Sequence, residues 1–354
     1  MTNALFRRFR PTQIRELITV LIIIGIVLFF ATQIDNYLSA RTFNRISNDF
    51  PIIAVVAVGQ LLVVLTRNLD LSVGSQVAVV AWSTGRLMTE MPDLNPLLLV
   101  AIAMGMGVAM GSINGFIVAY GRVPAIITTL ATLAIFRSFL ITVAEAQTVT
   151  TRYLPDWIKS FPSTTVVEIG DIDLRLMFVM SLVVVAIVQL LITYLPYGRR
   201  LFAIGSNPDG ARMVGLPMQR DVFLAYLGCG ALAGLGGLMQ MAKFGTITVD
   251  SARGLELAVI AAVVVGGANI FGGSGSAIGV LLGAVLISVL DQSLNRWIGI
   301  SDFMRDALLG MLILVAVASD TILMGRLQTL WLRARRREEA RAAPPPALTG
   351  GSDG

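Results

Sequence analysis

Long apolar runs, each followed by a short polar segment, make up most of this chain. Many of the runs approach 20 residues, the length at which an α-helix crosses the roughly 30 Å of hydrocarbon in a bilayer. They are not the short alternating segments of a membrane β-barrel. The pattern predicts an all-α, polytopic membrane protein, because a helix satisfies its own backbone hydrogen bonds in lipid. We place about ten spans, at residues 16–34, 50–66, 71–89, 96–119, 123–144, 174–195, 222–242, 256–271, 275–296 and 303–324.

One short polar segment separates two neighbouring apolar runs, with hardly any loop between them. Residues 65–75 read LTRNLDLSVGS and place Arg67, Asn68 and Asp70 between apolar flanks. Asp and Asn compete locally for backbone hydrogen bonds, and glycine permits a sharp bend. In a membrane such a break is tolerated only where protein or a wet cavity surrounds it. We expect this segment to line the inner end of a translocation pathway; the alternative is an ordinary cytoplasmic hairpin with Arg67 at the lipid surface.

The chain also resembles itself. Residues 70–80 read DLSVGSQVAVV and residues 250–260 read DSARGLELAVI, and the same offset relates Val123 to Phe303, where the fifth and tenth spans start. Two units of five helices have opposite orientations, because five is odd, and inverted repeats are common in transporters. We expect a five-plus-five inverted repeat; chance similarity between Gly-, Ala- and Val-rich segments is the alternative. The candidate pathway or gate residues are Asn68, Asp70, Ser72, Gly74, Asp250, Gly254 and Glu256.

Charge predicts the orientation. Arginine gathers in the segments that lie inside when the N-terminus is inside, whereas the largest outside segment, 145–173, carries more acidic than basic side chains. This is the positive-inside pattern, so we expect cytoplasmic termini, a cytoplasmic loop at 196–221 and a periplasmic loop at 145–173. Residues 1–15 are basic, and no small-residue cleavage site follows the first span, which we interpret as retained. The transmembrane domain is expected to cover 16–325, followed by a disordered cytoplasmic tail at 326–354.

Composition excludes several kinds of chemistry. The chain is 55% hydrophobic and 14% charged, with a mean hydropathy of +0.78, which is too apolar for a soluble domain of 354 residues. It has no histidine and a single cysteine, Cys229, so an intrachain disulfide, His-based acid–base catalysis and the usual Cys/His metal sites are excluded. We therefore expect no catalytic and no metal-binding residues, and interpret Cys229 as a small buried packing residue.

The one sizeable inside loop, 196–221, reads PYGRRLFAIGSNPDGARMVGLPMQRD. It is too short for a nucleotide-binding domain, and the chain has no GxxxxGK[ST] phosphate-binding motif. Asn207 followed by Pro208 can start a helix, and Gly215 with Pro217 can end it. A short helix with apolar side chains suits a groove on another protein. The alternative is a surface loop that rests on its own bundle.

Several stretches resemble the permease subunits of bacterial ABC sugar importers of the ribose, xylose, rhamnose and autoinducer-2 type. They are TRNLDLSVGS (66–75), PAIITTLATLAIFRS (124–138), YGRRLFAIGSNPDGARMVGLP (197–217) and GLELAVIAAVVVGGANIFGGSGSAIGVLLGA (254–284). The similarity covers about residues 40–325 in the family's order.

The resemblance implies a non-catalytic transmembrane subunit in the bacterial inner membrane that moves a monosaccharide or similar small polyol. It implies a second permease subunit, identical or related, two ATPase subunits beneath the pair, and a periplasmic sugar-binding protein above. ATP is then bound by the ATPase, so this chain needs no cofactor, and no nucleic acid is involved. Residues 207–216 would be the coupling helix. The implied coupling residues are Gly205, Asn207, Ala211, Arg212, Gly215 and Leu216.

An ion-coupled secondary transporter of a small polar solute is the alternative function. It needs a carboxylate near mid-span, whereas the acidic residues of this chain gather near span ends. Arg137, deep in the fifth span, could snorkel, pair with a carboxylate or support the pathway wall. An intramembrane enzyme would need His, paired mid-span Asp or a Ser nucleophile motif. The glycine clusters at 234–237, 265–267 and 272–275 favour close helix packing over ligand contacts.

Overall fold

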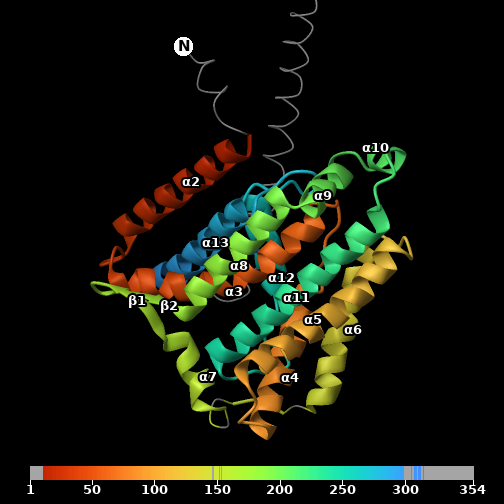
Figure 1. The fold of residues 1–354 in the computed structure, drawn as a ribbon. Coiled ribbons are helices and arrows are strands. Elements are labelled where there is room, and N and C mark those ends of the chain that lie inside the picture. Colours follow the sequence, from red (N-terminus) through yellow and green to blue (C-terminus); the bar gives the residue numbers. More distant parts are fainter. Residues whose placement is uncertain are drawn as a thin grey trace, which may run out of the picture. The chain divides into compact units, whose positions relative to one another are not determined.

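Helix α3 (Ala40–Val64) lies in the middle of the helix bundle (Figure 1). The computed structural model of the protein describes residues 11–298 except 146, 151 and 153, together with residues 304, 307, 308, 310, 311 and 314. Every residue from Phe50 to Val64 is buried. A helix that is apolar around its whole circumference needs such an enclosure, because it has no polar face to turn toward water.

Helices from the second half of the chain form most of that enclosure. Buried side chains of α3 such as Leu61 share one apolar core with Tyr226 and Val259. The helices that pack on α3 are α8 (Leu176–Tyr194), α11 (Met218–Phe244), α12 (Leu255–Val265) and α13 (Ala277–Ile298). The core therefore depends on contacts between segments that are distant in the sequence.

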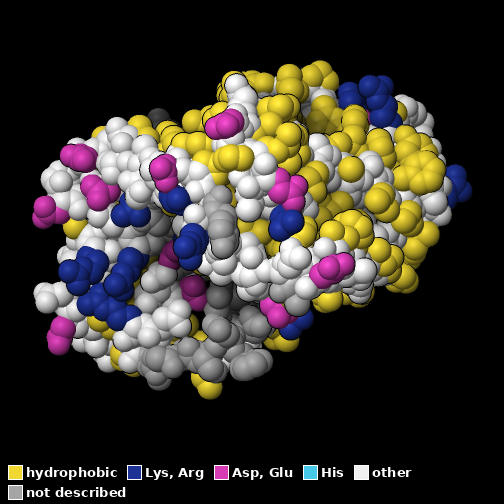
Figure 2. All heavy atoms as spheres, turned by 90° about the horizontal axis from the view of Figure 1, so that it is seen from below, with side chains coloured by type: hydrophobic (Ala, Val, Ile, Leu, Met, Phe, Trp, Pro, Cys, Tyr) yellow, Lys and Arg dark blue, Asp and Glu magenta, His cyan; other side chains and the backbone are white. Residues whose placement is uncertain are grey.

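Other helices lie outside this centre. Helix α2 (Pro11–Gln33) packs on α13, while α4 (Val73–Glu90) and α5 (Pro96–Ala119) pack on α11, and α6 (Ala125–Ala144) packs on α4. Large apolar side chains on these helices are exposed, for example Leu21, Phe116 and Ile127. In the view from below, hydrophobic side chains cover much of one half of the visible face, and charged side chains are frequent on the other half (Figure 2). An apolar flank of this kind suits contact with lipid.

Nine of the ten predicted spans coincide with helices, namely α2 to α6, α8, and α11 to α13. Seven of the described helices are long and apolar enough to cross a membrane, and α4 and α12 are not among them. The tenth predicted span, 303–324, lies largely outside the described residues, as does the tail at 326–354. The protein is thus mostly helical with several candidate membrane spans. The count of ten and the inverted repeat stay predictions.

The two ends of the bundle carry different short elements. At one end lie α9 (Pro196–Ser206) and α10 (Pro208–Met213). At the other end lie α7 (Asp156–Ser160), the 3-10 turn η2 (Phe161–Ser163) and an antiparallel hairpin. Its strands are β1 (Thr165–Ile169) and β2 (Ile172–Arg175), joined at Gly170 with φ +60°. The predicted periplasmic loop is therefore largely structured, and it lies at the end of the bundle opposite the predicted cytoplasmic loop (Figure 1).

Candidate translocation and coupling site

The break between α3 and α4 is a tight turn inside the protein. Arg67 has φ +65°, and Asn68 N donates back to Val63 O at 3.3 Å, which closes the end of α3. A non-glycine residue in this left-handed region costs about 1–2 kcal/mol, so the surrounding contacts must stabilise the turn. The helix break predicted at LTRNLDLSVGS is confirmed, because α3 ends at Val64 and α4 begins at Val73.

Asp70 is the centre of a buried polar network at this break. Its carboxylate has no exposed surface and accepts hydrogen bonds from Ser72 N at 2.9 Å and Ser72 Oγ at 2.6 Å. Gln76 Nε2, one turn into α4, donates at 3.0 Å, and Asn114 Nδ2 of α5 donates at 3.2 Å. A buried carboxylate is costly unless it is hydrogen-bonded in this way. The network therefore holds the start of α4 against α5.

Two further helices bind the backbone of the same turn. With its side-chain amide oriented so that both ends are satisfied, Gln60 of α3 pairs with the N–H and C=O of Asp70 at 3.0 and 3.3 Å. Tyr226 of α11 donates its hydroxyl to Leu69 O at 3.2 Å. Buried backbone groups almost always find such partners. Because protein encloses Asp70 and Ser72 here, their role in lining a pathway stays a prediction.

Asn68 lies at the edge of an open cavity of about 820 Å³. The turn between α5 and α6 and the segment that joins α10 to α11 form the other walls, with Arg122, Arg212 and Arg220 among the lining side chains. Asn68, a candidate pathway residue just before the first matched segment, thus lines this cavity.

The second matched segment has a different environment. Asp250 is 65% exposed and pairs with Arg253 at 3.0 Å, whereas its counterpart Asp70 is fully buried. Gly254, with φ +80°, precedes the first residue of α12 and donates its N–H to Glu256 Oε1 at 3.3 Å. The sequence match at these aspartates therefore does not correspond to the same local structure.

The two matched segments nevertheless meet. Gly74, in the first turn of α4, packs so closely on the Glu256 carboxylate that a Cβ on Gly74 would clash, and the same Cβ would lie 3.0 Å from Ala252 O. Arg137 reaches the second segment from α6 and donates to Val249 O at 2.7 Å and Ser251 O at 2.9 Å. Arg137 thus binds backbone carbonyls at the start of the second segment, and its support of a pathway wall stays a prediction.

The predicted coupling helix is present as α10. Asn207 caps it by accepting from Gly210 N at 3.0 Å, and Gly215, with φ +75°, ends it while Leu216 N donates to Ala211 O at 3.0 Å. These are the start and stop devices expected from the sequence. Ala211, however, is buried within its own chain at 5% exposure. The side chains that α10 leaves free for a partner include Met213 and Val214, which are 86% and 75% exposed.

Helix α9, which leads into α10, is fixed at both ends. Near its start, Arg200 makes two hydrogen bonds to the fully buried Asp221 of α11, at 2.6 and 3.1 Å. This interaction raises the pKa of Arg200, and burial together with the charge of Asp221 raises the pKa of Tyr197, so both side chains keep their protons. Near its end, Gly205 has no room for a Cβ, because Leu65 O and Gly273 N lie against it.

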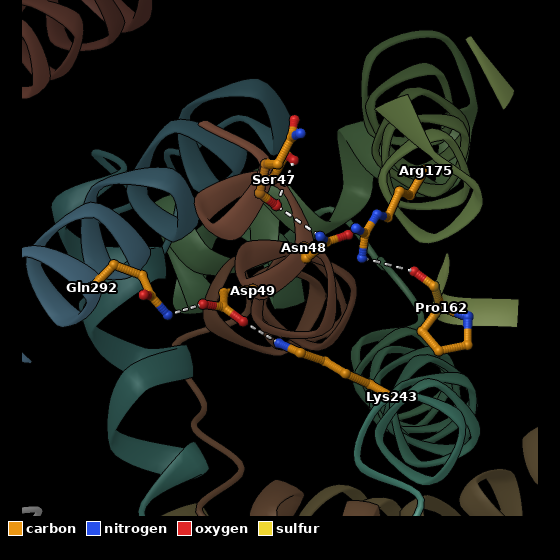
Figure 3. A network of polar contacts seen from close by, with 8 residues as sticks. Ser47, Asn48, Asp49, Pro162, Arg175, Lys243 and Gln292 are labelled. Carbon is orange, nitrogen blue, oxygen red and sulfur yellow. Dashed lines mark hydrogen bonds and ion pairs between the residues drawn. The ribbon is translucent and has the colours of Figure 1, made fainter. Parts of the chain in front are cut away.

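A polar cluster at the opposite end of the bundle was missed by the sequence analysis. Figure 3 shows Lys243 of α11 and Gln292 of α13 reaching the carboxylate of Asp49 on α3. The second span predicted at 50–66 leaves out the polar run at 40–49, whereas α3 begins at Ala40. The acidic and amide residues of this run could have indicated the polar cluster. These residues stay helical because partners on other elements satisfy their side chains. Asn44 Oδ1, for example, accepts a hydrogen bond from Asp173 N on β2 at 3.0 Å.

A bundle of membrane-spanning helices with a broken, buried helix pair and a short capped helix at one end is typical of a transport permease. Residues 42–317 match the family described as branched-chain amino acid transport system / permease component, and the chain belongs to this family. It is a transmembrane permease subunit of an ABC importer. Membership implies the inner membrane as its location and, in general terms, an ATPase and a binding protein as partners.

Particular relatives cover nearly the whole chain. The probable ABC transporter permease protein y4mJ of Sinorhizobium fredii is 32% identical over 298 residues, 84% of this chain and 86% of that protein. The autoinducer 2 import system permease protein LsrC of Escherichia coli O157:H7 is 31% identical over 350 residues, 97% of this chain and 96% of that protein. LsrC of Salmonella typhi is 30% identical over 333 residues, 94% and 92% of the two chains. No solved structure matches the chain.

Proposed function

We propose that this chain is the non-catalytic membrane subunit of an ATP-driven importer for a neutral small polyol, a monosaccharide or a solute of the autoinducer-2 class. The observation that carries the proposal is the likeness to autoinducer 2 permeases over 97% of the chain.

The proposed assembly places partners at both ends of the bundle. Two permease chains pair, ATPase subunits contact the α9–α10 end, and a periplasmic binding protein delivers the solute at the end that carries α7 and the hairpin. Arginines at the α9–α10 end, including Arg122, Arg199 and Arg212, support a cytoplasmic location for this end. Cytoplasmic termini are part of the same proposal. ATP is bound by the ATPase, and this chain carries no cofactor.

Within this assembly α10 docks on the ATPase through Met213 and Val214. Two adjacent large apolar side chains left exposed at a water-facing end suit contact with a partner. Ala211 then has a different role from the one expected from the sequence, because it holds α10 on its own chain. ATP-driven closure of the ATPase pair would displace α10 and α9 and so move the permease between outward and inward states.

Reconstitution tests this function. The permease, its cognate ATPase and its cognate binding protein are placed in vesicles, and uptake of labelled monosaccharides and of labelled leucine is measured with and without ATP. We expect accumulation of a polyol only when all components and ATP are present. Accumulation of leucine instead of a polyol would contradict the substrate class. Concentrative uptake by the permease alone would contradict the ATP-driven mechanism.

Docking is tested by the double substitution Met213→Glu and Val214→Glu. Because both side chains are exposed, the variant should fold and insert normally, yet the ATPase recovered with it should fall about tenfold, since two buried carboxylates would oppose docking. The matched control is Val166→Glu on β1, which is 48% exposed at the other end of the bundle and should retain the ATPase. Full recovery of the ATPase with the double variant would show that α10 is not the docking element.

A further inference from the structure

We propose that Arg67 is a positioning residue that couples movement of α9 and α10 to the buried break between α3 and α4. The proposal rests on the proposed function, because it presupposes that α10 docks on an ATPase. Arg67 Nε donates to Gly205 O at 2.5 Å, and Arg67 Nη2 donates to Ser206 O at 3.0 Å. These are the last two carbonyls of α9, which have no partner within their own helix. The guanidinium thus caps α9 from a different segment of the chain.

A third segment binds at the contact between Arg67 and the end of α9, which we call the junction. Gly273 N donates to Leu65 O at 3.1 Å, and Ser206 Oγ donates to Gly273 O at 3.4 Å. The segment 272–275 precedes α13, while Leu65 immediately follows α3. Gly272, with φ +83°, packs against Arg67 so tightly that a Cβ on Gly272 would lie 2.5 Å from Arg67 Cγ. The end of α9, the turn after α3 and the turn before α13 therefore touch without intervening space.

The junction is adjacent to the buried hydrogen-bond network around Asp70. Arg67 lies three residues before Asp70, whose carboxylate binds the side chains of Gln76 on α4 and Asn114 on α5. Leu69, between them, accepts from Tyr226 of α11. A shift of the α9 end must either carry the 65–70 turn with it or break both guanidinium hydrogen bonds. Each such charge-assisted bond is strong enough to make joint movement the favoured outcome.

An arginine that only marks the cytoplasmic surface would be expected to extend toward lipid or water. Arg67 instead folds back onto two carbonyls of another segment from a backbone with φ +65°. Arg122 offers the contrast within the same chain. It also has positive φ, at +58°, and it lines the cavity that Asn68 borders, but it has no hydrogen bond to α9 among the contacts of the described residues.

The test compares Arg67→Ala with Arg122→Ala in the reconstituted complex of permease, ATPase and binding protein. For Arg67→Ala we expect unchanged ATPase recovery and basal hydrolysis, with uptake per ATP reduced about tenfold or more, because two charge-assisted hydrogen bonds are lost. Arg122→Ala should stay within about twofold of the unsubstituted complex. Normal uptake per ATP in Arg67→Ala overturns the proposal. A loss of assembly in proportion to the loss of uptake also overturns it, because Arg67 would then be merely structural.

A rescue experiment separates coupling from folding. Arg67→Cys and Ser206→Cys are combined in a Cys229→Ser background, and a short bifunctional thiol reagent joins the two segments. Uptake per ATP should be low before cross-linking and should recover afterwards, since the bridge replaces the hydrogen bonds. A fully cross-linked complex that stays uncoupled contradicts the proposal. Absence of ATP-dependent uptake in the complex with unsubstituted permease would instead count against the proposed function itself, so the two failures are distinguishable.

Discussion

Asp70 and Asp250 occupy equivalent positions in the two matched segments, yet they differ in burial and in the number of hydrogen-bond partners. Asp70 is fully buried and accepts from a backbone N–H, a hydroxyl and two amides. Asp250 forms one exposed ion pair with Arg253. An exposed pair contributes about 0–1 kcal/mol. A buried donor left unsatisfied costs about 1–3 kcal/mol. Loss of the Asp70 carboxylate removes the acceptor of Ser72 N and Ser72 Oγ, while Gln76 and Asn114 keep a hydrogen bond to Ser72 Oγ.

We therefore predict that Asp70→Ala lowers the melting temperature and membrane yield of the purified protein far more than Asp250→Ala does. Asp70→Asn should be intermediate, because it keeps one acceptor oxygen but adds donors opposite Gln76 and Asn114. Thermal unfolding in detergent, followed by the fraction that stays monodisperse, measures the difference. Equal losses for the two alanine variants would show that burial of Asp70 does not stabilise the break.

Sequence reasoning found these residues but could not separate them. Asp, Gly and the apolar flanks predicted a break at both 65–75 and 250–260. Which carboxylate is enclosed depends on Asn114 and Gln60, which reach Asp70 from other helices. The sequence places Arg67 in the interrupting segment but does not identify its partner carbonyls, because Gly205 and Ser206 lie 138 and 139 residues further along. Such contacts leave no local pattern.

Helices α5 and α11 pack closely on each other through small residues. Gly107 on α5 faces Gly230 O and Gly234 N, the latter 2.8 Å from where a Cβ would lie, and Gly111 faces Tyr226 O. Small residues allow helix backbones to approach in this way in membranes. The expectation that the glycines at 234–237 serve close packing is confirmed at Gly234, which has no room for a Cβ beside Ala103 O.

Gly107→Leu should separate α5 from α11 and abolish stable folding, while Gly105→Leu, two residues away, should be tolerated. A side chain on Gly105 meets nothing within 4 Å, whereas one on Gly107 meets backbone that cannot rotate aside. Overpacking of this kind costs about 1–3 kcal/mol or more. The yield of monodisperse protein from membranes is the measurement. Similar yields for the two variants would mean that the α5–α11 contact does not limit stability.

At the scale of elements, hydropathy predicted where most helices lie. It failed where polar side chains in a helix have hydrogen-bond partners that are distant in the sequence. The predicted span 96–119 coincides with α5, and 174–195 closely matches α8. The start of α3 was placed ten residues late, because ARTFNRISND has no apolar run; its Asp49 and Asn44 find partners on other elements. The loop predicted at 145–173 contains most of the hairpin, whose strands are short and partly exposed and so leave little pattern in the sequence.

The orientation of the whole chain can be tested by labelling. Ser160 and Met213 are both exposed and lie at opposite ends of the bundle. In a Cys229→Ser background, Ser160→Cys should react with a membrane-impermeant maleimide in intact cells, and Met213→Cys only after the cells are opened. Gly205 is unsuitable for this purpose, because it has no space for a side chain. Reaction of the Met213→Cys variant from outside would reverse the predicted orientation.

The central position of α3 has a consequence for the order in which the protein is synthesised. In its most apolar stretch 83% of residues are buried, and three of the four helices that pack on it, α11, α12 and α13, begin at Met218 or later. The ribosome therefore completes well over half of the chain before the enclosure of α3 can form. During that interval Asp49 lacks its native partners Lys243 and Gln292. A nascent chain stalled before residue 218 would therefore present α3 to lipid or to the insertion machinery instead of to its native neighbours.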